Sequence, residues 1–177
     1  DEQLGRLMKH LDDTGLAGNT VVIYCSDNGY YISEHGLGDK RSAYEESMRI
    51  PMIVRCPGLV PEGKLADEMV LNIDIAPTLL DMAGVKAPES MQGRSLKPLI
   101  SGKKPEWRNA FFYEYFLEKN YMTPMTLAVR TGNAKLIKYP GHDDWEELYD
   151  LMKDPYEMTN LVKDEKSKDL LAVMREE

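Results

Sequence analysis

The stretch TVVIYCSDNG, residues 20–29, joins a short apolar run to a polar sequence that ends in glycine. Residues 20–25 are rich in β-branched side chains and show no apolar–polar alternation, which is typical of a strand buried on both faces, as in a parallel sheet. The preceding residues 4–11 place leucine and methionine at helical spacing, and Gly15 and Gly18 end that helix. Helix, short loop and buried strand predict the second half of a βαβ unit.

Asp27, Asn28 and Gly29 directly follow the predicted strand. Ligands of open α/β sheets bind at the carboxyl ends of parallel strands, and carboxylate and amide oxygens are hard ligands that suit calcium or magnesium. Asn-Gly is also the commonest tight-turn sequence, so a simple turn is the alternative. The polar stretch at residues 30–41 fits the second strand of a hairpin poorly, which favours a functional loop.

The next elements continue the α/β pattern. Residues 50–56 predict a strand, and Asp74 predicts the N-cap of a helix with Pro77 in its first turns and Gly84 at its end. The residues expected on the buried face of this helix are Ile75, Leu79, Met82 and Ala83. A short helix is expected around residues 95–100.

The remainder of the chain has a different character. Residues 110–116, 126–131 and 134–139 predict strands, residues 147–151 a fourth strand, and Gly132-Asn133 a tight hairpin. Residues 164–177 predict an amphipathic helix with Leu170, Leu171 and Met174 facing inward. We therefore expect two domains, an α/β part at residues 1–90 and a small α+β subdomain with an antiparallel sheet and a C-terminal helix at residues 91–177.

Composition excludes several classes of protein. The 177 residues carry a net charge of −8, which argues against a general nucleic-acid binder. No apolar stretch is long enough for a membrane span. The two cysteines, Cys25 and Cys56, are too few for a disulfide scaffold and are expected to be small buried apolar residues. Because the sequence starts inside a helix without a methionine, we expect the natural N-terminus to lie further upstream.

Several segments, in order, resemble the type I sulfatases of the alkaline-phosphatase superfamily. VVIYCSDNGYYISEHGLGDKRSAYEESMRIPMIVRCPG at residues 21–58 resembles the region around the sulfatase metal site. Four later segments also resemble the family. NIDIAPTLLDMAG (72–84) resembles the helix after that site, and MQGRSLKPLISG (91–102) resembles the linker. AVRTGNAKLIKY (128–139) resembles the C-terminal hairpin, and ELYDLMKDPYEMTNL (147–161) resembles the closing signature. The resemblance implies the C-terminal part of an alkaline-phosphatase-like α/β/α sandwich, followed by the small antiparallel sheet subdomain.

The resemblance also implies roles for three residues. Asp27 and Asn28 occupy the positions of calcium ligands, and Lys40 that of a catalytic lysine which contacts the sulfate. His35 is a further candidate catalytic and substrate-binding residue, because an imidazole suits proton transfer or a hydrogen bond to the substrate, either directly or from behind the residues that touch it. A solvated lysine and a structurally bonded histidine are the alternatives for Lys40 and His35. Arg41, Tyr44 and Glu45 are expected to order the loop, and a simple ion pair with a carboxylate is the alternative for Arg41.

The sulfatase nucleophile is a formylglycine made from Cys or Ser in a Cys/Ser-x-Pro-x-Arg motif, and neither Cys25 nor Cys56 stands in one. We therefore expect the nucleophile in an N-terminal part of the same polypeptide, and no sulfatase activity from these residues alone. The implied substrate is a sulfated small molecule or glycan, with N-acetylglucosamine 6-sulfate favoured by the DNGYY and EHG sequences. The implied location is periplasmic or secreted.

Three other functions remain open from the sequence. A phosphodiesterase or phosphonate hydrolase of the same superfamily would share the fold and the Asp27 ligand but use an unmodified Thr or Ser nucleophile. A non-catalytic calcium-binding module would bind ligand and refold alone. A degenerate sulfatase-like protein would lack the nucleophile altogether.

Overall fold

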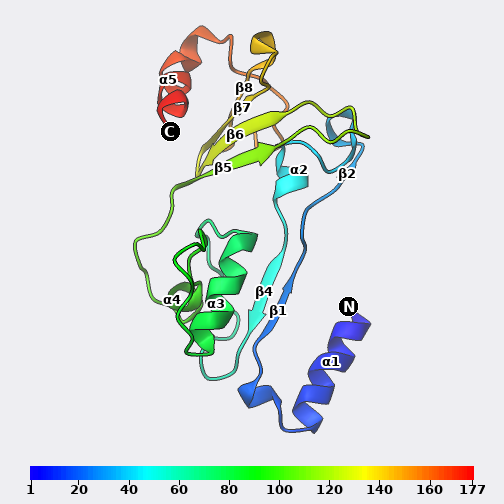
Figure 1. Cartoon of the computed structure of the whole chain (residues 1–177), viewed down its shortest axis with the longest axis vertical. Helices are drawn as coiled ribbons and strands as arrows, with labels where there is room; N and C mark the ends of the chain where they lie inside the picture. Colours follow the sequence, from blue (N-terminus) through cyan, green and yellow to red (C-terminus); the bar gives the residue numbers. More distant parts are fainter. The chain divides into compact units, whose positions relative to one another are not determined.

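The computed structural model describes all residues from Asp1 to Glu177, and the chain forms two compact units. The first contains residues 1–26 and 51–107, and the second contains residues 27–50 and 108–177. Figure 1 labels the main elements of both. The domains expected at residues 1–90 and 91–177 stay a prediction.

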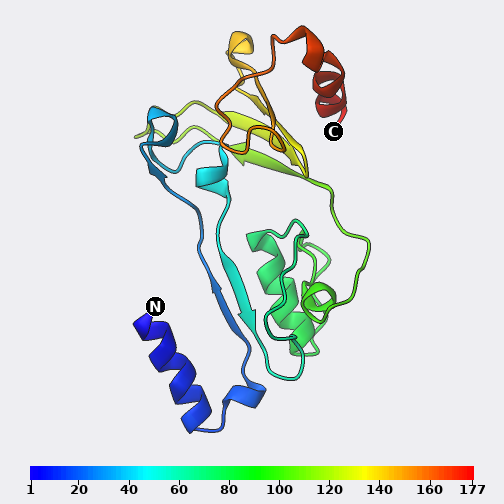
Figure 2. The ribbon, with the colours of Figure 1, turned by 180° about the vertical axis from the view of Figure 1, so that it is seen from behind.

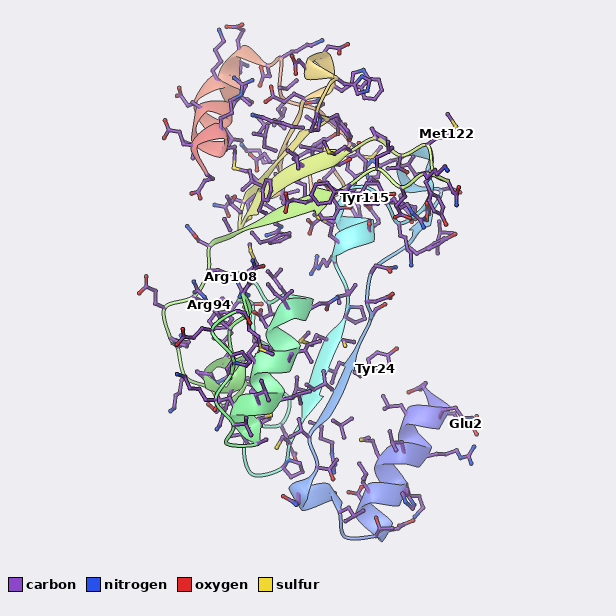
Figure 3. The ribbon with its side chains drawn as sticks, in the orientation of Figure 1. Glu2, Tyr24, Arg94, Arg108, Tyr115 and Met122 are labelled. Carbon is purple, nitrogen blue, oxygen red and sulfur yellow. The ribbon has the colours of Figure 1, made fainter.

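The first unit contains a short antiparallel ribbon. Helix α1 (Glu2–Asp13) and a 3-10 turn η1 (Ala17–Asn19) lead into strand β1 (Val22–Cys25), which pairs antiparallel with β4 (Met52–Arg55). The prediction of a parallel neighbour is therefore wrong for this pair, because an apolar run indicates burial but not the direction of the adjacent strand. Tyr24 projects from β1 and is half exposed (Figure 3).

The helix predicted after Asp74 is present as α3 (Ile75–Met82), preceded by a 3-10 turn η3 (Asn72–Asp74). The Asp74 carboxylate is fully buried and accepts backbone N–H bonds from Leu71 and Arg94, both at 2.8 Å. It therefore holds the start of α3 to the loop that leads into the short helix α4 (Lys97–Ile100).

The buried face of α3 differs from the prediction. Pro77 and Thr78 are its buried residues, whereas Leu79 and Ala83 are exposed. The hydroxyl of Thr78 accepts the backbone N–H of Leu96 at 2.8 Å, so a polar contact fixes the face that packs inward. Apolar periodicity alone could not show this.

A four-stranded antiparallel sheet forms most of the second unit, as predicted. Its strands are β5 (Ala110–Tyr115), β6 (Thr126–Thr131), β7 (Ala134–Lys138) and β8 (Glu147–Asp150), in that order across the sheet. Gly132 and Asn133 connect β6 to β7 in the predicted hairpin.

The sheet is covered on both faces. Leu136 and Leu148 pack with Met174 of the C-terminal helix α5 (Lys168–Glu176), which follows a 3-10 turn η5 (Glu165–Ser167). Figure 2 shows the segment between β8 and η5, in orange, crossing the sheet. None of the helices combines the length and apolarity that a bilayer span requires.

The opposite face carries the contacts that position the candidate site. Ile137 and Tyr149 alternate with Leu136 and Leu148 along their strands and pack against Ala43. Ala43 is fully buried, so the polar segment at residues 27–50 is anchored to the sheet close to its own middle.

Candidate functional site

The polar segment begins with a small hairpin, β2 (Tyr31–Ile32) and β3 (Gly38–Asp39), closed by a 3-10 turn η2 (Glu34–Gly36). Ser33 and His35 in this turn have φ angles of 83° and 53°, in the left-handed region that non-glycine residues seldom adopt. Such backbone conformations persist only where surrounding contacts hold them and are common at functional sites.

Gly29 lets two parts of the segment approach closely. Its backbone N–H donates to the carbonyl of Ser47 at 2.7 Å, next to the short helix α2 (Glu45–Met48). A Cβ atom at this position would lie 1.9 Å from the backbone oxygen of Glu46, which no side chain can tolerate. The glycine of the Asp-Asn-Gly sequence is therefore required by contact, and the segment is not a simple hairpin turn.

Lys40 and Asn28 meet across twelve residues of sequence. The Lys40 ammonium donates to the Asn28 side-chain oxygen at 2.9 Å, and both residues are partly buried. The Lys40 backbone carbonyl accepts the hydroxyl of Ser47, so main chain and side chain are both held. The Asp27 carboxylate accepts the Asn28 backbone N–H at 2.9 Å, which keeps the two oxygen donors adjacent.

These oxygens fit part of a calcium site. The Asp27 carboxylate and the Asn28 amide are hard oxygen donors of the type that calcium prefers, but calcium takes six to eight oxygens. The chain offers no group of three His, Cys, Asp or Glu side chains that could hold a metal ion. The donor chemistry therefore fits and the number of donors does not, so a calcium ion at this position would need further ligands.

His35 is oriented by two neighbours. Its Nε2 atom lies 3.3 Å from a carboxylate oxygen of Glu46, and its ring stacks on Tyr44 at a centroid distance of 4.0 Å and an angle of 9°. His35 makes no hydrogen bond with Lys40. These contacts match the alternative in which His35 is a structurally bonded histidine. Its role in substrate binding stays a prediction.

Glu45 ties the segment to the sheet through a buried charge cluster. Lys135 of β7 is fully buried and lies 2.9 Å from Glu45 and 2.7 Å from Glu157. Arg130 contacts the other Glu45 oxygen at 3.3 Å. The Glu157 side chain accepts the Glu45 backbone N–H at 2.7 Å, so α2 is bonded through both its backbone and its side chain.

The two carboxyl groups of the cluster have opposite pKa shifts. Burial raises the pKa of Glu157 more than the attraction of Lys135 lowers it. Burial would also raise the pKa of Glu45, but Lys135 and Arg130 together outweigh it and leave that pKa lowered. Glu45 is therefore the firmly ionised partner.

Arg41 pairs with a carboxylate, as the sequence interpretation allowed. Its guanidinium contacts both Asp39 oxygens, at 2.5 and 2.6 Å, and lies 3.4 Å from the centre of the Tyr121 ring. It also reaches Glu118 at 3.4 Å, in the loop between β5 and β6. Arg41 thus orders the hairpin end against that loop, whose Met122 extends fully into solvent (Figure 3).

The structure brings Asn28 and Lys40 into contact, and Asp27 bonds the backbone of Asn28 next to it. Their functional roles stay predictions. Sequence reasoning missed Glu46 as the partner of His35 and Lys135 as the partner of Glu45. The sequence contained one signal for these partners. Glu45 and Glu46 are adjacent, and carboxylates require cationic or hydrogen-bonding partners when they are buried.

Comparisons with known proteins agree with the resemblance. Residues 33–177 match the family described as N-sulphoglucosamine sulphohydrolase, C-terminal. The chain is 42% identical over 166 residues to an N-acetylglucosamine-6-O-sulfatase of Bacteroides thetaiotaomicron, which covers 91% of this chain and 30% of the relative.

Solved structures give the same result. A structure described as a complex with its substrate D-glucosamine-2-N,6-O-disulfate matches with a TM-score of 0.92 and 35% identity, over 99% of this chain and 36% of the other. The phosphonate monoester hydrolase of Agrobacterium radiobacter matches with a TM-score of 0.86 and 28% identity, over 99% and 37%. The chain thus spans about a third of the length of the proteins that it matches.

Proposed function

We propose a function from one premise: the chain belongs to the sulfatase family and corresponds to the C-terminal portion of a type I sulfatase with an alkaline-phosphatase-like fold. The intact protein is a sulfuric ester hydrolase that cleaves sulfate esters of a glycan. The single observation that carries this proposal is the contact between Lys40 and Asn28, with the Asp27 carboxylate beside them.

Lys40 supplies a fixed positive charge at the sulfate. Sulfate-ester cleavage concentrates negative charge on the oxygens around sulfur, and a preorganised cation lowers the energy of that arrangement. Its bond to Asn28 holds the ammonium in place before substrate arrives, so little reorganisation is needed. In the bound state the sulfate competes with the Asn28 oxygen for the same ammonium protons.

Asp27 and Asn28 would hold calcium, which when bound adds positive charge at the sulfate oxygens. We propose that the remaining calcium ligands and the formylglycine nucleophile come from sequence outside these 177 residues, since neither cysteine stands in the required motif. His35, held by Glu46 and Tyr44, would donate a hydrogen bond to the substrate.

The relatives indicate the class of substrate. Their descriptions name N-acetylglucosamine-6-O-sulfatase activity, a glucosamine disulfate substrate and a hexuronate 2-O-sulfatase. We extend the first two to this protein and propose a glucosamine-type 6-O-sulfate on a glycan. A relative from Drosophila melanogaster is described as extracellular, which favours a location outside the cytoplasm for the intact protein.

A direct test measures sulfate release by the intact protein and by two of its lysine variants. The intact protein should release sulfate from N-acetylglucosamine 6-sulfate, and Lys40→Ala should lower kcat/KM by on the order of 100-fold or more, as expected for the loss of one electrostatic group. Lys104→Ala, at an exposed position of the first unit, is the matched control and should change little. Equal activity of the Lys40 and Lys104 variants would overturn the role of Lys40.

Phosphonate monoester hydrolysis is the second candidate, because a hydrolase of that class matches the fold over nearly the whole chain. The same preparation should therefore be offered a phosphonate monoester. A higher kcat/KM for the phosphonate than for the sulfate ester would replace the sulfatase proposal. Calcium affinity gives a readout separate from turnover: Asp27→Ala should weaken it, and unchanged affinity would remove Asp27 from the metal site.

A further inference from the structure

A concave site lies in the second unit, and its lining does not include Asp27, Asn28 or Lys40. It is an open cavity of about 560 Å³, within the range typical of small-molecule sites. Its lining includes four aromatic residues and one glutamate: Tyr44, Tyr139, Trp145, Tyr149 and Glu147. They come from the start of α2, the end of β7, the 3-10 turn η4 (Asp143–Trp145) and β8.

Glu147 is surrounded by phenol groups. Tyr44 and Tyr149 donate to one carboxylate oxygen at 2.8 and 2.6 Å, and Tyr139 donates to the other at 2.8 Å. Burial and the Glu147 charge raise the pKa of all three phenols, so they remain neutral donors at ordinary pH. No lysine or arginine forms an ion pair with Glu147, whose hydrogen-bond partners are the three phenols.

The rings around this carboxylate form an aromatic enclosure. Tyr139 and Trp145 meet edge to face at 6.0 Å, and Tyr44 and Tyr149 do so at 6.1 Å. His142 stacks on one face of Trp145, but the ring remains about half exposed, so a ligand can still reach it. Aromatic faces attract cations, and the adjacent Glu147 carboxylate adds a charge of opposite sign.

The other charged groups of the lining disfavour an anion. Asp144 and Glu146 add negative charge, although Glu146 is paired with Arg175 at 3.1 Å. Lys163 is the one cationic side chain of the lining. The phenol hydroxyls, which could otherwise donate to a sulfate, are all bonded to Glu147. The cavity is thus chemically opposite to the Lys40 site.

We propose that this cavity binds an organic ammonium group, such as the amine of an amino sugar, between the aromatic rings and the Glu147 carboxylate. The ammonium contacts the carboxylate, and the three phenol bonds stay intact. Although Tyr44 also stacks on His35, ammonium binding here requires neither Lys40 nor a sulfate ester, and it would remain if the intact protein hydrolysed a different ester.

The test titrates the intact protein with glucosamine, at a pH where its amine is protonated, and with neutral N-acetylglucosamine. Binding is followed through the indole N–H resonance of Trp145, assigned with Trp145→Phe. Glucosamine should shift this resonance to saturation and N-acetylglucosamine should not. Glu147→Gln should weaken glucosamine binding about tenfold or more, as expected for loss of a paired charge.

Two further variants separate folding from binding. Trp145→Ala alters a half-exposed ring, should leave the fold intact, and should weaken glucosamine binding several-fold. Lys40→Ala should leave this binding unchanged. The proposal is overturned if N-acetylglucosamine binds equally well, if neither sugar binds, or if binding survives Glu147→Gln and Trp145→Ala but is lost in Lys40→Ala.

Discussion

The ammonium group of Lys135 lies 2.7 Å from a carboxylate oxygen of Glu157, and both side chains are fully buried. The same ammonium reaches Glu45, and Glu157 holds the Glu45 backbone, so one buried cation joins the sheet to the segment that carries the candidate site. Glu157 adopts a φ of 53° to make this contact, a conformation that costs free energy and is maintained by the cluster.

Replacing Lys135 by methionine should destabilise the protein strongly. The buried Glu157 carboxylate would lose its cation and Glu45 would keep only Arg130, and breaking a buried pair in this way costs about 3–5 kcal/mol. The free energy of unfolding, measured by denaturant titration, reports the loss. Lys138→Met is the matched control, because Lys138 lies on the same strand, is half exposed and contacts Glu146 only at 3.7 Å. Similar losses of unfolding free energy in the two variants would show that the Lys135 cluster stabilises the protein no more than the exposed Lys138 does.

Gly29→Ala should lower activity more than stability. The added Cβ cannot coexist with the Glu46 backbone oxygen at 1.9 Å, so residues 27–30 have to move and the Asn28–Lys40 bond is displaced. Misplacement by about 1 Å can cost on the order of 100-fold in rate. The measurement is kcat/KM of the intact protein. Gly132→Ala, where the added atom meets nothing within 4 Å, should retain activity, and a fully active Gly29 variant would contradict the required close approach.

Stability should fall steeply in alkali because of the tyrosines around Glu147. Their folded-state pKa values are raised above the ordinary value near 10, so above pH 10 the unfolded chain releases protons that the folded chain retains. This favours unfolding, by up to about 1.4 kcal/mol per tyrosine for each pH unit. Below pH 10 these groups contribute no pH dependence.

Tyrosinate absorbance and denaturation midpoints, recorded together from pH 9 to 12, check this expectation. Tyr139→Phe should reduce the alkaline loss of stability by one group, whereas Tyr156→Phe, at an exposed position, should not change it. Tyrosine titration with no accompanying loss of stability would count against the buried cluster.

The elements that sequence predicted correctly are those specified locally. The strands of the second unit and the Gly132-Asn133 hairpin follow from residues close in the chain, and β6, β7 and β8 lie within a residue of the predicted ranges. The direction of the β1–β4 pair and the exposed position of Leu79 were not specified locally, because each depends on which surface packs against the element.

The same distinction applies to the candidate site. Asn28 and Lys40 belong to one motif and their contact follows from the family resemblance. Tyr44 reaches Glu147 across 103 residues, and Glu45 reaches Lys135 on a different strand. Such long-range pairs produce no periodic pattern in the sequence. The cavity around Glu147 and the buried Lys135 cluster could therefore be found only from the fold.

The contact between His35 and Glu46 should appear as energetic coupling in catalysis. If Glu46 orients His35 toward substrate, His35→Ala removes the group that Glu46 acts on, and adding Glu46→Gln should then cost little more. Interacting residues show coupling of about 0.5–3 kcal/mol in a double-mutant cycle, here measured on kcat/KM of the intact protein. His142 stacks on Trp145 at 4.0 Å and 9°, the geometry with which His35 stacks on Tyr44. The matched cycle therefore combines His142→Ala with Glu46→Gln, and its effects should be additive. Additive effects in both cycles would leave His35 a structural residue, because its bond to Glu46 would then have no consequence for the reaction.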